Sequence, residues 1–260
     1  GNLTRQIQYS KVFKLLKERG YNFISLPSAY SATNDMPLAN ITLSYGGALN
    51  EFDNMAISLT PLSRFGLRNM QYDDHRKKIN FNFEQLSKLD DYKKPMFVFS
   101  HILSPHPPFL FGEKGEPINP DIEFFINDFN KVGPAIMGDY KTQYPNQIKY
   151  LNSKLLIMVD EIIKNSKKPP IIILQGDHGP ASILLSDGPT KDALKEHFSI
   201  LNAIYAPALK NDGIFFSTMS PVNTFRLIFN KYFEEKYEIL PDKRYYQSRT
   251  PPFKFDEVIF

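Results

Sequence analysis

The stretch that decides the fold runs from Pro169 to Pro180 and reads Pro169-Pro170-Ile171-Ile172-Ile173-Leu174-Gln175-Gly176-Asp177-His178-Gly179-Pro180. Its apolar run is typical of a strand buried on both faces in a parallel sheet. An acid and an imidazole, Asp177 and His178, follow before a Gly-Pro turn. Ligands of open α/β sheets bind at the carboxyl ends of such strands. The stretch therefore predicts a site, and both side chains can ligate a divalent metal ion.

A structural explanation of the same pair remains open. Asp177 could accept backbone N–H bonds in a capped turn, with His178 at the surface, because turns that contain an acid are common. The spacing of the two residues does not separate this turn from a metal site.

Strands alternate with helices along the chain, which indicates an α/β fold. Apolar runs predict strands at 21–26, 95–103, 169–174 and 198–206, and apolar periodicity predicts helices at 9–19, 147–165 and 221–233. A further helix is expected to begin near Pro37, residues 49–91 to be mostly helical, 110–140 to form a long loop, and 253–260 to form an edge strand. We expect one domain over residues 1–260, an α/β/α sandwich of three layers with a mainly parallel central sheet.

Composition excludes several classes of function. The chain has 260 residues, no cysteine and a net charge of +3. Disulfides, thiolate catalysis and cysteine-ligated metals are therefore absent. No dense block of basic residues suggests nucleic-acid binding, and Arg76-Lys77-Lys78 is expected to be solvated surface. No stretch is long enough to span a membrane, and the start at Gly1 leaves room for anchoring segments upstream.

Two histidines follow the predicted strand at 95–103. His106 lies between two prolines, which make the loop stiff and suit a residue that must point at a substrate. The alternative interpretation of His106 is a partly exposed histidine in a rigid turn. His101, at the strand end, is as consistent with a core histidine as with a site residue.

Thr33 lies in a polar segment, Ser28 to Asp35, after the strand at 21–26. A metal ion can activate a hydroxyl as a nucleophile, and N–H groups at a helix N-terminus can receive an anion. The alternative is a helix N-cap cluster. Asp73-Asp74-His75 is a competing metal candidate, but it follows no buried strand and is expected at the surface. Since parallel strands share one carboxyl edge, the segments after the strands could meet.

Several segments, in this order, resemble the alkaline phosphatase/sulfatase-like superfamily. Within it, the chain is most similar to bacterial membrane-anchored sulfatase-domain proteins related to lipoteichoic acid synthase and phosphoethanolamine transferases. The resemblance covers nearly the whole chain, and its most specific segments are His101-Ile102-Leu103-Ser104-Pro105-His106-Pro107-Pro108-Phe109, Gln147 to Asn152, Ile171 to Pro180, Ser199 to Tyr205, and Ser220 to Arg226.

The resemblance implies a role for each candidate residue. Thr33 would be the nucleophile, in a stretch similar to the family's Ser-x-Tyr-x-x-Thr, and Asp177 and His178 would be two ligands of one divalent metal ion (Mn, Mg or Zn). His106 and His101 would be substrate-binding residues. The absence of cysteine excludes the formylglycine of true sulfatases.

The chain departs from the family pattern at two places. The family's first metal-binding acid lies on a strand before the nucleophile, and Gly1 to Ser10 contains no acidic residue. We therefore expect that the domain, in the sequence that starts at Gly1, lacks the first strand of the family. Glu196-His197 stands where relatives place an arginine.

The resemblance implies a metal-dependent phosphoryl-group transferase, or a hydrolase of phosphodiester, phosphate or sulfate esters. Its substrate would be a small-molecule or lipid-linked ester at the extracytoplasmic face of a bacterial membrane, reached through membrane segments outside this chain. Nucleic acid is not expected as a partner. The alternative is a non-catalytic sulfatase-like binding or structural domain of a membrane protein.

Overall fold

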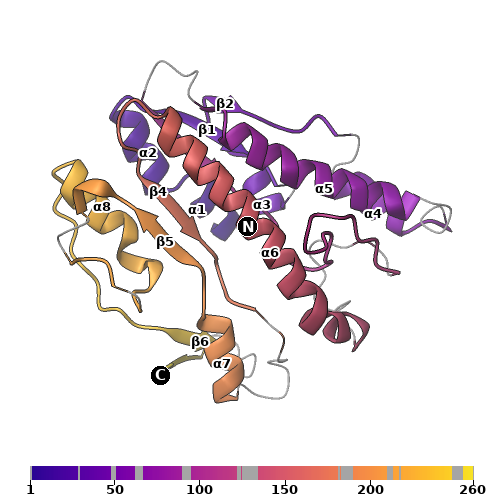
Figure 1. Ribbon diagram of the computed structural model, residues 1–260. Helices are drawn as coiled ribbons and strands as arrows, with labels where there is room; N and C mark the ends of the chain where they lie inside the picture. Colours follow the sequence, from indigo (N-terminus) through magenta and orange to yellow (C-terminus); the bar gives the residue numbers. More distant parts are fainter. Residues whose placement is uncertain are drawn as a thin grey trace. The chain divides into compact units, whose positions relative to one another are not determined.

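The computed structural model describes residues 2–28, 30–47, 51–61, 67–89, 95–121, 124, 134–180, 182, 190–209, 213–216, 218–247 and 254–259 (Figure 1). It divides into two compact units, Gly1–Lys167 and Lys168–Phe260. The first contains a small parallel sheet and the second two small antiparallel sheets, so the predicted mixed α/β class is confirmed. The single domain over residues 1–260 stays a prediction.

A three-stranded parallel sheet organises the first unit. β1 (Asn22–Leu26) lies between β2 (Ile41–Thr42) and β3 (Met96–Ser100). The register pairs Ile24 with Ile41 on one side and with Val98 on the other. The strands predicted at 21–26 and 95–103 are therefore present, slightly shorter than expected.

Aromatic packing joins this sheet to α2 (Lys11–Glu18). Phe13 of α2 stacks on Phe23 of β1 with ring centroids 4.6 Å apart, and Phe97 and Phe99 of β3 pack against the same pair. The Ser10 hydroxyl accepts a hydrogen bond from the Phe13 N–H and caps the helix. The helix predicted at 9–19 is thus confirmed, because its apolar face meets the sheet.

The helix expected near Pro37 is wrong. The chain instead forms a single turn of helix, α3 (Ser31–Asn34), and Pro37 lies in a turn. The Asn40 side-chain oxygen accepts a hydrogen bond from the Phe23 N–H at 3.0 Å, and β2 follows at once. Pairing beside β1 requires extended backbone here, which outweighs the local helix signal.

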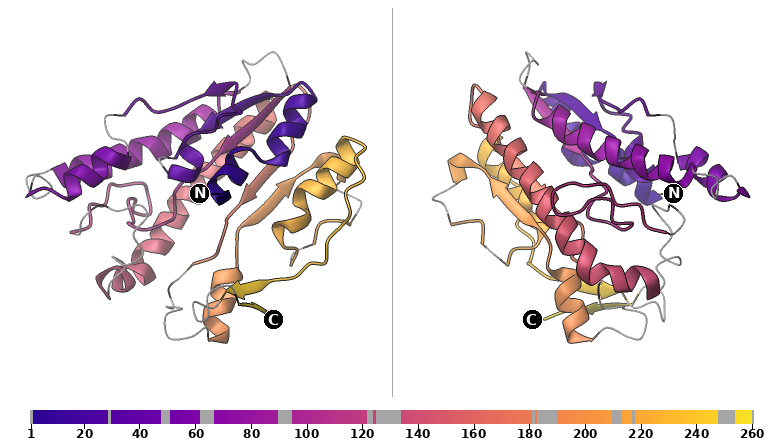
Figure 2. Two further views of the ribbon diagram at one scale, coloured as in Figure 1. Left: turned by 180° about the vertical axis from the view of Figure 1, so that it is seen from behind. Right: turned by 45° about the vertical axis from the view of Figure 1, so that its right-hand side comes forward.

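Two short and two long helices complete the described part of the first unit. α1 (Asn2–Gln8), α4 (Glu51–Ser58), α5 (Leu67–Leu86) and α6 (Pro134–Asn165) are the remaining ones among the described residues. α6 begins well before the predicted start at Gln147 and continues through Pro145. The expected loop at 110–140 is shortened accordingly, and residues 122–123 and 125–133 of it lie outside the described residues. The part at 101–121 lies between α5 and α6 (Figure 2).

Two antiparallel strand pairs organise the second unit. β4 (Ile172–Gln175) pairs with β5 (Asn202–Tyr205), and β6 (Tyr245–Gln247) pairs with β7 (Phe255–Glu257), which is the edge strand predicted near the C-terminus. β4 is half-buried rather than buried on both faces, and it does not belong to the parallel sheet.

The helices of the second unit are α7 (Lys191–Phe198) and α8 (Thr224–Tyr232), with 3₁₀ turns at Pro207–Leu209 and Pro221–Asn223. α8 and its preceding turn confirm the helix predicted at 221–233. α7 was not predicted, and it takes the first residue of the strand expected at 198–206. The sequence feature that could have predicted α7 is Thr190. Its hydroxyl caps the helix by accepting a hydrogen bond from the Ala193 N–H. None of the helices among the described residues is long and apolar enough to cross a membrane.

Candidate functional site

Three polar side chains meet at the carboxyl edge of the parallel strands. Ser28 follows β1, Thr33 lies on α3, and His101 follows β3. Thr33 Oγ1 lies 2.7 Å from His101 Nδ1, and Ser28 Oγ lies 3.1 Å from the same nitrogen. The two hydroxyl oxygens are 3.4 Å apart. We call these three residues the edge site.

The parallel register explains why these residues meet. Leu26 pairs with Ser100, so the chain leaves β1 and β3 side by side and in the same direction. Ser28 is 4% exposed and Thr33 7% exposed, so both hydroxyls are shielded from solvent. The Tyr30 and His101 rings form a T-shaped pair with a centroid distance of 5.6 Å. The expected meeting of the segments after these two strands is confirmed.

His106 lies further along the loop at 101–121. Its Nδ1 atom contacts the carbonyl oxygen of Pro107, the next residue, and its side chain is half-buried. A ring nitrogen that bonds the adjacent backbone is held in one orientation. This contact agrees with the stiffness expected of the proline-rich segment.

His75 of α5 holds the start of this loop. Its side chain is 5% exposed and hydrogen-bonds the backbone of Leu103. Burial, with the nearby charge of Lys78 as the next cause, lowers the pKa of His75 to about 3. The expectation that Asp73-Asp74-His75 lies at the surface is therefore wrong for the histidine, because α5 packs against the loop.

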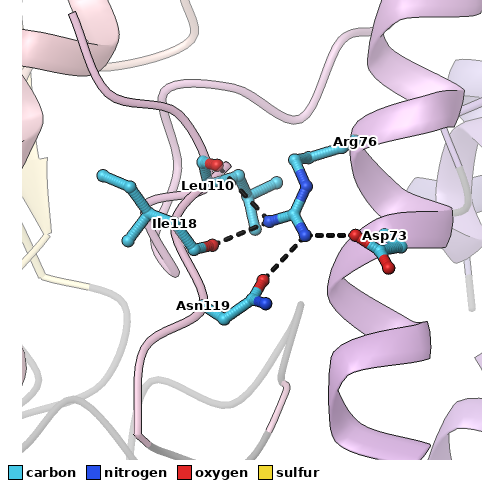
Figure 3. A network of polar contacts seen from close by, with 5 residues as sticks. All are labelled: Asp73, Arg76, Leu110, Ile118 and Asn119. Atoms are coloured by element: carbon cyan, nitrogen blue, oxygen red, sulfur yellow. Dashed lines mark hydrogen bonds and ion pairs between the residues drawn. The ribbon is translucent and has the colours of Figure 1, made fainter. Parts of the chain in front are cut away.

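Arg76, the next residue of α5, holds the far end of the loop (Figure 3). Its guanidinium donates to the carbonyl oxygens of Ile118 at 2.7 Å and Leu110 at 3.4 Å, and to the side-chain oxygen of Asn119 at 2.7 Å. It also pairs with Asp73. Arg76 was expected to be solvated, but it is 6% exposed because the loop's carbonyls need a buried donor.

Gln147 of α6 fastens the loop from the other side. Its side-chain oxygen accepts hydrogen bonds from the backbone N–H groups of Leu110 at 2.7 Å and Phe111 at 3.2 Å. The side chain is fully buried. Contacts from two helices thus set the path of the segment that begins at His101.

Asp177 and His178 form a turn directly after β4, in the second unit. His178 Nδ1 lies 2.7 Å from the Gly179 carbonyl oxygen, which places the ring proton on Nδ1 and the lone pair on Nε2. Nε2 lies 3.9 Å from Asp177 Oδ2, and the Asp177 side chain is 89% exposed. Asp177 Oδ1 also accepts a hydrogen bond from the His178 N–H, so features of both a capped turn and a ligand pair are present.

The end of α7 supports this turn. The Gly179 N–H donates to the His197 carbonyl oxygen at 2.6 Å, and a Cβ atom on Gly179 would lie 2.2 Å from the Glu196 carbonyl oxygen. Only glycine therefore fits here. The approach stacks the His178 and His197 rings, with centroids 4.9 Å apart. Burial and the nearby His178 lower the pKa of His197.

The turn opens into a pocket of about 340 Å³. We call Asp177, His178 and His197 the turn site. The wall opposite is aromatic and polar, and comes from β6: Tyr245, Tyr246 and Gln247. Two imidazoles, a carboxylate and two phenols line this pocket beside Phe198 and Ile200, so it offers hydrogen-bonding groups and lone pairs to a polar or cationic ligand.

The turn site fits a metal ion in part. Bonds from a divalent ion to nitrogen and oxygen are about 2.0–2.2 Å long, so donors up to about 4 Å apart can share an ion. Asp177 Oδ2 and His178 Nε2 meet that limit. Within the described ranges, however, no cluster of three or more histidine or acidic side chains is arranged to hold a metal.

The candidate residues fall into two groups. Thr33, His101 and His106 belong to the first unit, and Asp177 and His178 to the second. Sequence reasoning missed Ser28 as an individual residue, although a hydroxyl soon after a strand was a usable signal. It also missed Arg76, whose burial has no local signal.

Comparison with known proteins adds no assignment. No protein-family model matches the chain, and no curated protein matches it significantly.

Proposed function

We propose that this chain is a sulfatase-like enzyme that transfers or hydrolyses a phosphate or sulfate ester through a covalent intermediate on Thr33. The observation that carries the proposal is the 2.7 Å contact between Thr33 Oγ1 and His101 Nδ1 at the carboxyl edge of β1 and β3. A hydroxyl within hydrogen-bonding reach of a base is the arrangement that nucleophilic catalysis needs. Strand ends of this kind are where α/β enzymes bind ligands.

The choice of phosphorus or sulfur chemistry rests on the resemblance to the alkaline phosphatase/sulfatase-like superfamily. The same resemblance underlies the proposal of a three-layer α/β/α sandwich around a mainly parallel sheet. It also underlies a lipid-linked or small-molecule substrate at the outer face of a bacterial membrane.

Other residues have supporting roles in this proposal. Asp177 and His178 would hold a divalent metal ion, with the lone pair of His178 Nε2 directed by the Nδ1 contact to Gly179. Such an ion, when bound, would supply positive charge to an anionic ligand. His106, on its stiff loop, would contact an anionic oxygen of the substrate.

Turnover of chromogenic esters tests the proposal. The chain is assayed with p-nitrophenyl phosphate, bis-p-nitrophenyl phosphate and p-nitrophenyl sulfate, each with Mn²⁺, Mg²⁺ or Zn²⁺. Thr33→Ala is expected to lower turnover by at least about 10³-fold, because the substitution removes the attacking oxygen. Thr42→Ala, an exposed threonine on β2, is the matched control and should not change it.

Intact-mass spectrometry of quenched reactions should show one phosphoryl or sulfuryl group on the wild type and none on Thr33→Ala. Unchanged turnover in Thr33→Ala would refute the nucleophile assignment. A wild-type chain that binds these esters without turning them over would instead support the non-catalytic sulfatase-like module.

A further inference from the structure

We infer that His101 is the catalytic base for Thr33, acting through Nδ1, and that Ser28 is the donor that stabilises the Thr33 oxygen as its proton leaves. This inference rests on the proposed function and adds the route of the proton and the role of a second hydroxyl. It is carried by hydrogen bonds among Ser28, Tyr30, Thr33 and His101.

The hydrogen bonds of the edge site have a consistent direction. The Tyr30 N–H donates to Ser28 Oγ at 3.1 Å, so Ser28 accepts there and its own proton is left to donate elsewhere. Ser28 Oγ lies 3.1 Å from His101 Nδ1, but the single lone pair of that nitrogen is taken by the shorter contact from Thr33. The Ser28 proton is therefore assigned to Thr33 Oγ1, 3.4 Å away. Thr33 in turn donates to His101 Nδ1 at 2.7 Å, the shortest contact of the cluster. Each hydroxyl thus accepts one hydrogen bond and donates one, which polarises the chain toward His101.

The rival partner of the Thr33 hydroxyl is local. A threonine in a short helix commonly bonds a nearby backbone carbonyl, and here the Tyr30 carbonyl oxygen lies 3.5 Å away. The bond to His101, 68 residues along the chain, is much shorter. The fold therefore directs this hydroxyl to an imidazole rather than to its own helix.

The ring of His101 is also oriented for this role. The Tyr30 ring forms a T-shaped pair with it, and Ser28 Oγ lies 3.1 Å from the same Nδ1 atom. An imidazole that accepts at Nδ1 in its neutral form carries its proton on Nε2. The assignment therefore fixes the tautomer of His101, which can be measured.

The proposed reaction has two steps, attack by Thr33 and hydrolysis of the covalent intermediate. Thr33 Oγ1 forms a bond to phosphorus while its proton passes to His101 Nδ1, the ester P–O bond breaks, and the leaving oxygen takes a proton from water. A water oxygen then forms a bond to phosphorus, the bond from phosphorus to Thr33 Oγ1 breaks, and Thr33 regains its proton from His101. The attacking water loses a proton to solvent, and the enzyme is restored.

Four variants of the whole chain, assayed with Mn²⁺ and bis-p-nitrophenyl phosphate, test the inference. His101→Gln retains an acceptor for the Thr33 hydroxyl but cannot take its proton, so we expect a fall in kcat of about 10²–10⁴ with KM nearly unchanged. His101→Ala should fall similarly and regain activity with added imidazole, whereas Thr33→Ala should not. Ser28→Ala should lower kcat about tenfold, the effect of losing one hydrogen bond of about 1.4 kcal/mol.

The outcomes separate the inference from the proposed function. Activity that survives Thr33→Ala overturns both. Loss of activity in Thr33→Ala, with His101→Gln within about threefold of wild-type kcat, overturns only the role of His101 as base. Equal activity in Ser28→Ala and the wild type overturns the role of Ser28.

A measurement on the unaltered protein covers variants that fail to fold. Long-range ¹H–¹⁵N spectra of histidine-labelled protein report which ring nitrogen is protonated. The proton of neutral His101 is expected on Nε2, and a proton on Nδ1 would overturn the inference.

Discussion

Ser28, Thr33 and His101 of the edge site are bonded to one another and both hydroxyls are buried, whereas Asp177 of the turn site is almost fully exposed. The edge site lies at the carboxyl ends of two parallel strands. The loop that follows His101 is hydrogen-bonded to side chains of α5 and α6. The turn site is held by local hydrogen bonds within the turn, by the contact of Gly179 with His197, and by the stack of the His178 and His197 rings.

The difference shows two ways in which polar side chains can be positioned for function. Groups that exchange a proton must be held at hydrogen-bonding distance before a substrate arrives. Groups that ligate a metal acquire much of their order from the ion itself. We therefore expect substitutions that loosen the first unit to affect stability strongly, and substitutions in the turn site to affect mainly ligand binding.

The largest effect is expected from Arg76→Met. The carbonyls of Leu110 and Ile118 would lose their buried donor, so the free energy of unfolding should fall by about 4 kcal/mol. Urea denaturation measures this change. Lys88→Met, which removes an exposed pair with Glu84, is the control and should leave the midpoint unchanged. Equal midpoints for the two variants would mean that the Arg76 network does not hold the loop.

The pH dependence of stability should identify His75. Its pKa is about 3 in the folded chain against 6.5 when unfolded, so between these values the unfolded chain binds more protons. The free energy of unfolding should therefore fall as the pH falls below 6.5, by about 3 kcal/mol at pH 4.5, and be insensitive to this group above 6.5.

His75→Gln retains a hydrogen-bonding side chain but does not titrate, so its urea midpoint should depend less on pH than that of the wild type. The midpoints are compared at pH 7, 5.5 and 4.5. The same pH dependence in both proteins would show that His75 is not the group responsible.

The smallest effect on stability is expected from Asp177→Asn. Because the side chain is exposed, the metal-free variant should unfold within about 0.5 kcal/mol of the wild type. Its affinity for Mn²⁺ or Zn²⁺, measured by calorimetric titration, should nevertheless fall at least about tenfold. Asp160→Asn, an exposed acid on α6, is the control. Affinity that is unchanged by Asp177→Asn would remove this residue from the metal site.

Much of the secondary structure could be predicted because its signals are local. The apolar runs of β1 and β3 and the periodic faces of α2 and α8 each lie within one segment. The errors arose where distant contacts outweighed local ones. The segment at Pro37 forms a turn that leads into β2, which pairs with β1, instead of forming a helix, and the isolated apolar run of β4 gives no information on the direction of its partner.

The candidate site, too, could be predicted from the sequence only in part. The amino-acid sequence alone was enough to place polar residues after strands, and to predict that the segments after parallel strands could meet. The structure brings together those after β1 and β3, whereas β4, whose strand was expected in the same sheet, pairs antiparallel with β5. The sequence could not show that Thr33 rather than another hydroxyl contacts His101, or that Arg76 is buried. Those outcomes depend on distances between residues far apart in the chain, and on carbonyl groups that only the folded loop presents. For this protein, local pattern determined which elements form, and tertiary packing decided which side chains are held ready to react.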